Sequence, residues 1–237
     1  YFSADKESVL LKTAVEILIL SVLPGLLWII YIYRRDRYEP EPKSMILKAF
    51  MLGALSVFLA LILEWFLDFG SDFILAVLTA PVIEEIVKFL IFMIFFYHHR
   101  DFDEPLDGII YACSIALGFA TLENFFYVFS ALEHERVYQV AGLRAFLSIP
   151  GHFLFSALWG YAAAVTKFKM RRPVTLGAGL LAAILLHAAF NLTAVVSALG
   201  SGLFIAIISF YGWVLFSKRI RDLQKDSFRR NRDGFLD

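Results

Sequence analysis

Long apolar runs, separated by short charged or glycine-containing stretches, make up nearly the whole chain. A helix of about 20 apolar residues crosses the roughly 30 Å hydrocarbon layer of a membrane, because each residue advances the helix by about 1.5 Å. The runs predict seven such helices, at residues 13–33, 45–67, 73–97, 106–130, 142–166, 174–198 and 202–217. We therefore expect an all-α, polytopic membrane helix bundle over 13–217, and a single domain over 1–237.

Composition agrees with this pattern. Hydrophobic residues make up 59% of the 237 residues, whereas a soluble domain contains about 45–50%. The mean hydropathy is +0.70 and the formal net charge is zero. We expect the lipid bilayer as a partner and no nucleic acid. The one cysteine, Cys113, lies in an apolar run, so no internal disulfide is expected.

The basic residues are clustered, and their positions predict the orientation. Lysines and arginines follow the first, fifth and seventh predicted helices, whereas the opposite connections, DFGSD and EHERVYQ, are acidic or nearly neutral. Short cytoplasmic loops carry an excess of Lys and Arg. We therefore expect the N-terminus outside the cell, the C-terminus in the cytoplasm, and residues 218–237 as a basic cytoplasmic tail.

A few polar side chains lie deep within the predicted helices. An ionised group at the centre of a membrane helix costs about 2.5–3.5 kcal/mol on insertion scales, so such groups face a bundle interior or a wet cavity and often mark function. Four of them, on four different helices, lie roughly 10–17 Å below the outer surface if residues are counted from the outer ends. These are Glu84, Glu123, His152 and His187. We expect them to form a single site.

Helical spacing adds detail to this group. Glu84 and Lys88 are four residues apart and share a face, so the lysine can balance one carboxylate. Glu85 is rotated by about 100° and can point elsewhere. His187 and Asn191 also share a face. Spacing alone leaves open which glutamate is free to react, although it favours Glu85.

Carboxylates and imidazoles around a buried cavity suit hydrolysis. A carboxylate can act as general base toward water while an imidazole holds the water or donates to the leaving group, and Asn191 can donate to an oxyanion. The same residues suit zinc, with His152, His187, Glu123 and Glu85 as candidate ligands. Zinc and a metal-free, glutamate-activated water are equally compatible with these residues.

Other functions are weaker fits. The chain has no HExxH motif, no Gly-x-Ser-Gly setting for a serine nucleophile and no paired membrane aspartates. The main alternative is a transporter or channel for protons or a divalent cation, in which the same groups line a path. Transporters more often have repeated halves and broken helices. Pro81 lies near the cluster, and we expect no matching break elsewhere. Two individual residues have other interpretations. Glu123 can pair with Lys88 across helices, and Arg144, at the outer end of the fifth predicted helix, is expected as an interfacial anchor.

With EExxK (84–88), LEN (122–124), GH (151–152) and HAAFN (187–191) on successive helices, the sequence resembles the PrsW family of intramembrane proteases. The resemblance extends from about residue 20 to 217. PrsW proteins belong to a wider superfamily of CAAX prenyl proteases and bacteriocin-processing enzymes. Two departures from that wider pattern favour PrsW itself: Lys88 lies one position before the superfamily arginine, and Ser148 replaces a phenylalanine.

The resemblance implies a function and a set of site residues. It implies cleavage of a single-pass anti-sigma factor near its extracytoplasmic side, in the bacterial cell membrane. It places Glu84 and Glu85 on the paired glutamates of the first motif, and the superfamily pattern favours Glu84 as the base. It also assigns residues to the later motifs: His152 to the second, His187 and Asn191 to the third, and Glu123 to an additional glutamate.

Overall fold

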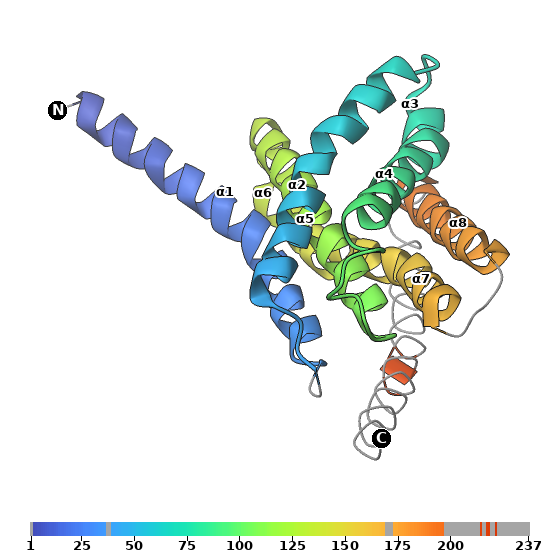
Figure 1. Ribbon diagram of the computed structural model, residues 1–237. Coiled ribbons are helices and arrows are strands. Elements are labelled where there is room, and N and C mark those ends of the chain that lie inside the picture. Colours follow the sequence, from blue (N-terminus) through green and yellow to red (C-terminus); the bar gives the residue numbers. More distant parts are fainter. Residues whose placement is uncertain are drawn as a thin grey trace.

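The computed structural model describes residues 2–36, 39–168 and 173–196, together with isolated positions 214, 217, 218 and 221 (Figure 1). These residues form helices and no strand, which confirms the all-α prediction. The α-helices are α1 (Phe2–Tyr33), α2 (Lys43–Phe66), α3 (Asp72–Ile74), α4 (Ala80–Phe95), α5 (Asp107–Ser130), α6 (Val137–Leu143), α7 (Ile149–Phe168) and α8 (Val174–Val196). Three short segments of other helix types continue them: η1 (Leu75–Thr79), η2 (Ala131–His134) and η3 (Arg144–Ser148).

Five helical segments of the described chain are long and apolar enough to cross a membrane: Leu11–Tyr33, Lys43–Phe66, Asp107–His134, Val137–Phe168 and Val174–Val196. They match five of the seven predicted helices. The third predicted helix is helical from residue 72 to 95, but Glu84, Glu85 and Lys88 keep it out of this group. The predicted seventh helix and the basic tail lie, apart from isolated positions, outside the described residues. The count of seven therefore stays a prediction.

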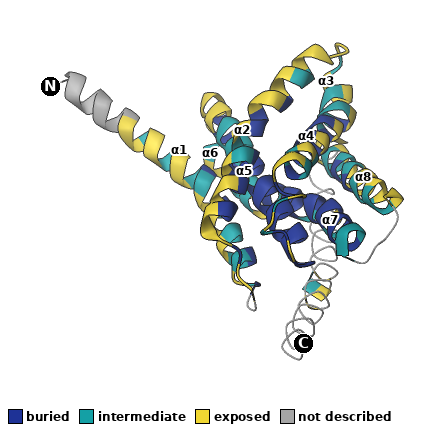
Figure 2. Cartoon of the chain, viewed as in Figure 1, coloured by how far each residue is buried: buried dark blue, intermediate teal, exposed yellow. Residues whose placement is uncertain are grey.

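Helix α5 is the centre of the bundle, since every residue from Asp107 to Thr121 is buried. Helices α1, α2 and α7 pack against it. Figure 2 shows the buried residues concentrated in α5 and α7, whereas α1, α2 and α8 present many exposed residues. Many of those exposed side chains are large and apolar, such as Leu18, Leu59 and Leu185. A surface of this kind suits the acyl chains of a bilayer.

Glycines allow α2 and α5 to approach closely. A Cβ atom on Gly118 would overlap the carbonyl oxygen of Phe50, and one on Gly53 would overlap the carbonyl oxygen of Ile115. Each helix therefore places a glycine against the backbone of the other, as small residues do at membrane helix interfaces.

Two helices contain a π-helical turn immediately before a proline. In η1, the Ala80 N–H donates to the Leu75 carbonyl, and Pro81 follows. In η3, the Ile149 N–H donates to the Arg144 carbonyl, and Pro150 follows. The expectation that Pro81 has no matching break elsewhere is therefore wrong. Because proline has no N–H, a carbonyl in each turn loses its usual donor, and the five-residue turn shifts the side chains that follow.

Candidate active site

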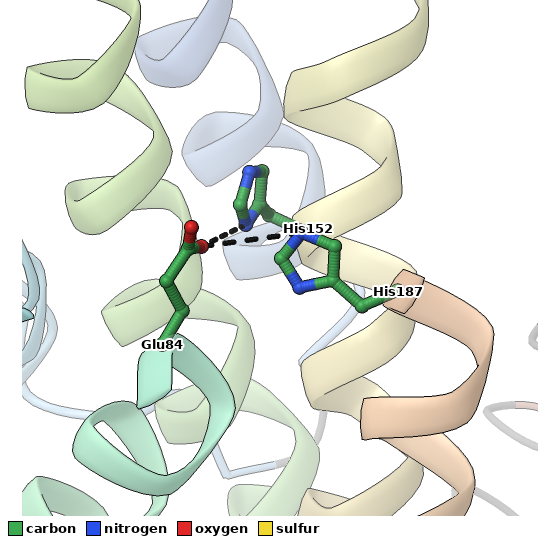
Figure 3. A group of neighbouring side chains, drawn as sticks. All are labelled: Glu84, His152 and His187. Carbon is green, nitrogen blue, oxygen red and sulfur yellow. Dashed lines mark ion pairs between the residues drawn. The ribbon is translucent and has the colours of Figure 1, made fainter. Parts of the chain in front are cut away.

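The structure brings Glu84, His152 and His187 together from α4, α7 and α8 (Figure 3). All three are buried, with 6%, 3% and 2% of their surfaces exposed. The π turn η1 directly precedes α4, and η3 directly precedes α7, so both unusual turns lie next to helices that carry site residues. Such turns are frequent at functional sites.

The Glu84 carboxylate faces both imidazoles. Its Oε2 lies 3.8 Å from His152 Nδ1 and 3.9 Å from His187 Nε2, which is too far for direct hydrogen bonds. Within the described part of the chain, this buried oxygen accepts no hydrogen bond. A buried carboxylate oxygen without a partner is costly. The three atoms therefore surround a common point that suits a bound ligand.

Glu85 has the opposite environment. It is fully buried, and Lys88 Nζ donates to its Oε1 over 2.6 Å. Its Oε2 accepts from Ser156 Oγ at 3.2 Å and from Trp159 Nε1 at 3.1 Å. His187 Nδ1 lies 3.1 Å from Oε1. The Glu85 carboxylate is thus committed to four partners.

This environment corrects the pairing suggested by spacing. Lys88 balances Glu85, three residues before it, and not Glu84, four residues before it. The lysine side chain can reach a carboxylate three or four residues away on the same helix face. The contact between Glu85 and His187 of α8 orients the Glu85 carboxylate toward the bundle interior. The preference for Glu85 as the freer glutamate therefore does not agree with the structure.

Glu123 lies on the other side of His152. Its Oε2 is 3.0 Å from His152 Nε2 and accepts a hydrogen bond from Arg144 Nη2 at 2.6 Å. Arg144 Nε also donates to the side-chain oxygen of Asn124 at 3.1 Å. Arg144 was expected as an interfacial anchor, but its side chain is only 13% exposed and points into the bundle. The alternative of a Glu123–Lys88 pair is wrong, because Glu123 pairs with Arg144 and Lys88 pairs with Glu85.

In each histidine, the inner nitrogen is the one that faces Glu84 and the outer nitrogen is the other one. A carboxylate contacts each outer nitrogen: Glu85 contacts His187 Nδ1, and Glu123 contacts His152 Nε2. Such carboxylates hold the ring orientation and keep the proton on the outer nitrogen, so that the inner nitrogen can bind a ligand. Lys88 Nζ also lies 3.2 Å from the inner nitrogen of His152. Glu85 and Glu123, predicted as candidate metal ligands, thus occupy supporting positions. Glu84 is the carboxylate that faces both rings.

Asn191 has a backbone partner. Its Nδ2 donates to the carbonyl oxygen of Ala76 at 2.8 Å. Ala76 is in η1, where the Ala80 N–H goes to Leu75 and Pro81 has no N–H to give. The amide therefore replaces a missing backbone donor. An oxyanion role for the Asn191 amide, as expected from sequence, would require it to leave this carbonyl.

A cavity of about 610 Å³ opens at these residues. Its polar lining includes Glu84, Glu123, His152, His187 and Asn191, whereas Glu85 and Lys88 do not border it. Most of the remaining lining is apolar and comes from α2, α5 and α8, including Val57, Phe119 and Phe190. This size is in the usual range for ligand sites. A mostly apolar cavity with a convergent carboxylate and two imidazoles suits hydrolysis of an apolar substrate.

Sequence comparison identifies relatives of the chain. Residues 41–217 match the model of the PrsW family intramembrane metalloproteases. Protease PrsW of Geobacillus kaustophilus is 37% identical over 175 residues, covering 72% of this chain and 76% of the relative. Protease PrsW of Bacillus subtilis is 34% identical over 177 residues, covering 72% and 78%. Protease PrsW of Clostridioides difficile is 37% identical over 186 residues, covering 74% and 78%.

No solved structure matches the chain. The family match and the relatives confirm the resemblance found in the sequence motifs, and the five apolar helices agree with it. The chain therefore belongs to the PrsW family of intramembrane metalloproteases and is a peptidase embedded, with several membrane passes, in the bacterial membrane.

Proposed function

We propose that Glu84, His152 and His187 activate the water that hydrolyses a peptide bond inside the membrane. One observation carries this proposal: Glu84 Oε2 is buried at the cavity, accepts no hydrogen bond within the described residues, and faces the inner nitrogens of both histidines. A carboxylate in this position is free to accept a proton. Glu85, with four partners, is not.

Each side chain of the site has a separate role in this proposal. Glu84 takes the proton of the attacking water and passes it to the leaving amine, as a general base and then a general acid. The inner nitrogens of His152 and His187 hold the water in place. Glu85 and Glu123 hold the two rings through their outer nitrogens. Lys88 and Arg144 balance the charges of these two supporting carboxylates.

The same three inner atoms can hold a metal ion if Lys88 Nζ, 3.2 Å from His152 Nδ1, turns away from that nitrogen and donates to Glu85 alone. One carboxylate oxygen and two imidazole nitrogens are a common donor set for catalytic zinc. One atom from each of Glu84, His152 and His187 lies within 4.8 Å of the others, and the outer carboxylates resemble the supports found behind zinc-bound histidines. We therefore propose zinc as the metal of this family member; with zinc bound, Glu84 Oε2 would be a ligand and not the proton acceptor described above. When bound, zinc lowers the pKa of a bound water to about 7.

We propose a single-pass membrane protein as the substrate, cleaved near its extracytoplasmic side, with an anti-sigma factor as the candidate. The apolar lining of the cavity supports a membrane-spanning substrate segment. The positions of basic residues in the sequence support seven helices in one domain over 1–237, with the N-terminus outside and residues 218–237 in the cytoplasm. In that orientation the site lies in the outer half of the membrane.

The second break before Pro150 removes one argument against a transporter, because transporters often contain paired broken helices. The match to a family of intramembrane metalloproteases instead supports a peptidase. Glu84, His152 and His187, which we propose to activate water, also line the cavity, and this favours a peptidase over an ion path.

The test uses the purified full-length protein in lipid nanodiscs and a peptide that spans the membrane segment of an anti-sigma factor. Glu84→Gln should reduce kcat about 10²–10⁴-fold, because it removes the group that accepts the proton. Glu133→Gln changes an exposed carboxylate on η2 and serves as the matched control. Normal cleavage by the Glu84→Gln protein would sink the assignment.

A second measurement addresses the metal. Elemental analysis should find one zinc per chain, lost together with activity in His152→Ala or His187→Ala and after treatment with a strong chelator. Full activity of protein that contains no metal would leave Glu84 as the base and remove zinc from the proposal.

A further inference from the structure

A second group of buried carboxylates lies far from the active site. Asp36 comes from the connection between α1 and α2, Glu104 from the connection between α4 and α5, and Asp107 from the first turn of α5. One oxygen from each lies within 4.8 Å of the others. Their exposed fractions are 4%, 3% and 0%. From residue 107 to Glu123, α5 advances about 24 Å, so this group and the active site lie toward opposite ends of one helix.

Two of these carboxylates use one oxygen each to hold the local backbone. Asp107 Oδ2 accepts from the N–H groups of Asp103 at 3.0 Å and Glu104 at 2.7 Å. Asp36 Oδ2 accepts from the N–H of Glu41 at 2.9 Å. The other oxygen of each, Oδ1, is buried and accepts no hydrogen bond within the described residues. Two elements thus each present a buried oxygen without a donor.

Glu41 adds a further buried carboxylate, with only 5% of its surface exposed. The hydroxyl of Tyr111 donates to its Oε2, and its carboxyl group contacts that of Asp107. Buried carboxyl groups gathered this closely are costly to ionise without a nearby positive charge.

Lys167 is a basic side chain that acts electrostatically on Asp107 of this group. Its ammonium donates to the carbonyl oxygens of Tyr97 at 2.9 Å and Phe102 at 2.6 Å. Within the described residues, Asp36, Glu41 and Asp107 form no ion pair with any basic side chain. A single shared proton can link Glu41 and Asp107, but it leaves the free oxygen of Asp36 unsatisfied.

We propose that Asp36, Glu104 and Asp107, supported by Glu41, bind one divalent cation of the oxygen-preferring class, Ca²⁺ or Mg²⁺. Carboxylate oxygens are the ligands that these ions prefer. The donor set contains no nitrogen, unlike that of Glu84, His152 and His187. The ion would join the α1–α2 connection to the start of α5, and its role is to stabilise the bundle. This site is independent of the proposed catalytic function.

The test follows thermal unfolding of the full-length protein in lipid nanodiscs, after removal of metals with a chelator. Ca²⁺ and Mg²⁺ are added in separate titrations at pH 8. At a cation concentration about 100 times the dissociation constant, we expect the Tm to rise by about 5–10 °C. Calorimetric titration with the metal alone should give one ion per chain, and the larger response identifies the ion.

Matched variants locate the binding site. Asp36→Asn and Asp107→Asn should abolish the cation-dependent rise in Tm. Glu39→Gln, which changes an exposed carboxylate of the same connection, should keep it. Glu84→Gln should also keep it, because the active site is separate.

Three outcomes would overturn the proposal. The first is a wild-type Tm and calorimetric titration that do not respond to either cation. The second is a full cation response in both Asp→Asn variants. The third is a higher Tm of those variants without metal, together with no cation response in the wild type, which would identify a proton-sharing acidic cluster. Glu41→Gln provides a further variant should an aspartate change prevent folding.

Discussion

At the residue scale, two adjacent glutamates have different environments. Glu84 and Glu85 differ by about 100° around the helix axis, so one faces the cavity and the other faces α7 and α8. Glu85 is held by Lys88, Ser156, Trp159 and His187. Glu84 is left with an oxygen that accepts no hydrogen bond within the described chain. We therefore propose that the pair comprises a reactive carboxylate, Glu84, and a supporting one, Glu85.

This separation predicts unequal effects of the same substitution. Glu85→Gln keeps the size of the side chain but removes the negative charge behind His187 Nδ1, so we expect kcat to fall about 10–100-fold, as for other supports of ligating histidines. Glu84→Gln should reduce kcat by a larger factor. The measurement is kcat for both variants on one peptide. Equal losses, or a larger loss in Glu85→Gln, would reverse the assignment.

At the element scale, the π turns explain how helices with prolines position the site. The turn η1 leaves the carbonyl of Ala76 without a backbone donor, and Asn191 of α8 supplies one. The side chain therefore links α8 to the start of α4, four residues after His187 on the same helix face. This link holds the helix of Glu84 against the helix of His187.

The link predicts a rescue experiment. Asn191→Ala removes the donor to Ala76, and a buried acceptor without a partner costs about 1–3 kcal/mol of unfolding free energy. Adding Pro81→Ala restores an N–H five residues after Ala76, so the double variant should be more stable than Asn191→Ala alone. Thr193→Ala, elsewhere on α8, is the control. Equilibrium unfolding in detergent measures the wild-type protein and these three variants, and a double variant no more stable than Asn191→Ala would refute the link.

At the scale of the whole molecule, orientation decides which side of the membrane the site faces. The lysines and arginines predict the connection between α2 and α3 outside the cell and that between α4 and α5 inside. The chain has one cysteine, Cys113, and it is buried. Its replacement gives a background in which single new cysteines can report their side.

In the Cys113→Ala background, a membrane-impermeant maleimide applied to intact cells should label Ser71→Cys but not His98→Cys. Both should react after the membrane is opened, which controls for accessibility. The measurement is the labelled fraction of the purified protein. The reverse pattern would invert the predicted topology and place the site in the inner half of the membrane.

Much of the site could be predicted from sequence, because apolar length and charge at membrane depth are local properties. The motifs containing Glu84, Glu123, His152 and His187 were found in this way, and the structure brings these residues together. Arg144 was missed as a site residue. It lies near a predicted helix end, and its partner Glu123 is on another helix. The second π turn was also missed, although Pro150 was its signal in the sequence.

By itself, the sequence determined a helical membrane peptidase of the PrsW family and the candidate side chains of its active site, since a charge buried in an apolar run is costly wherever the helices lie. Only the tertiary structure decided which glutamate Lys88 balances, which nitrogen of each histidine faces Glu84, and which carboxylates meet between Asp36 and Asp107. These pairings depend on the rotation and depth of neighbouring helices. No spacing within one helix contains that information.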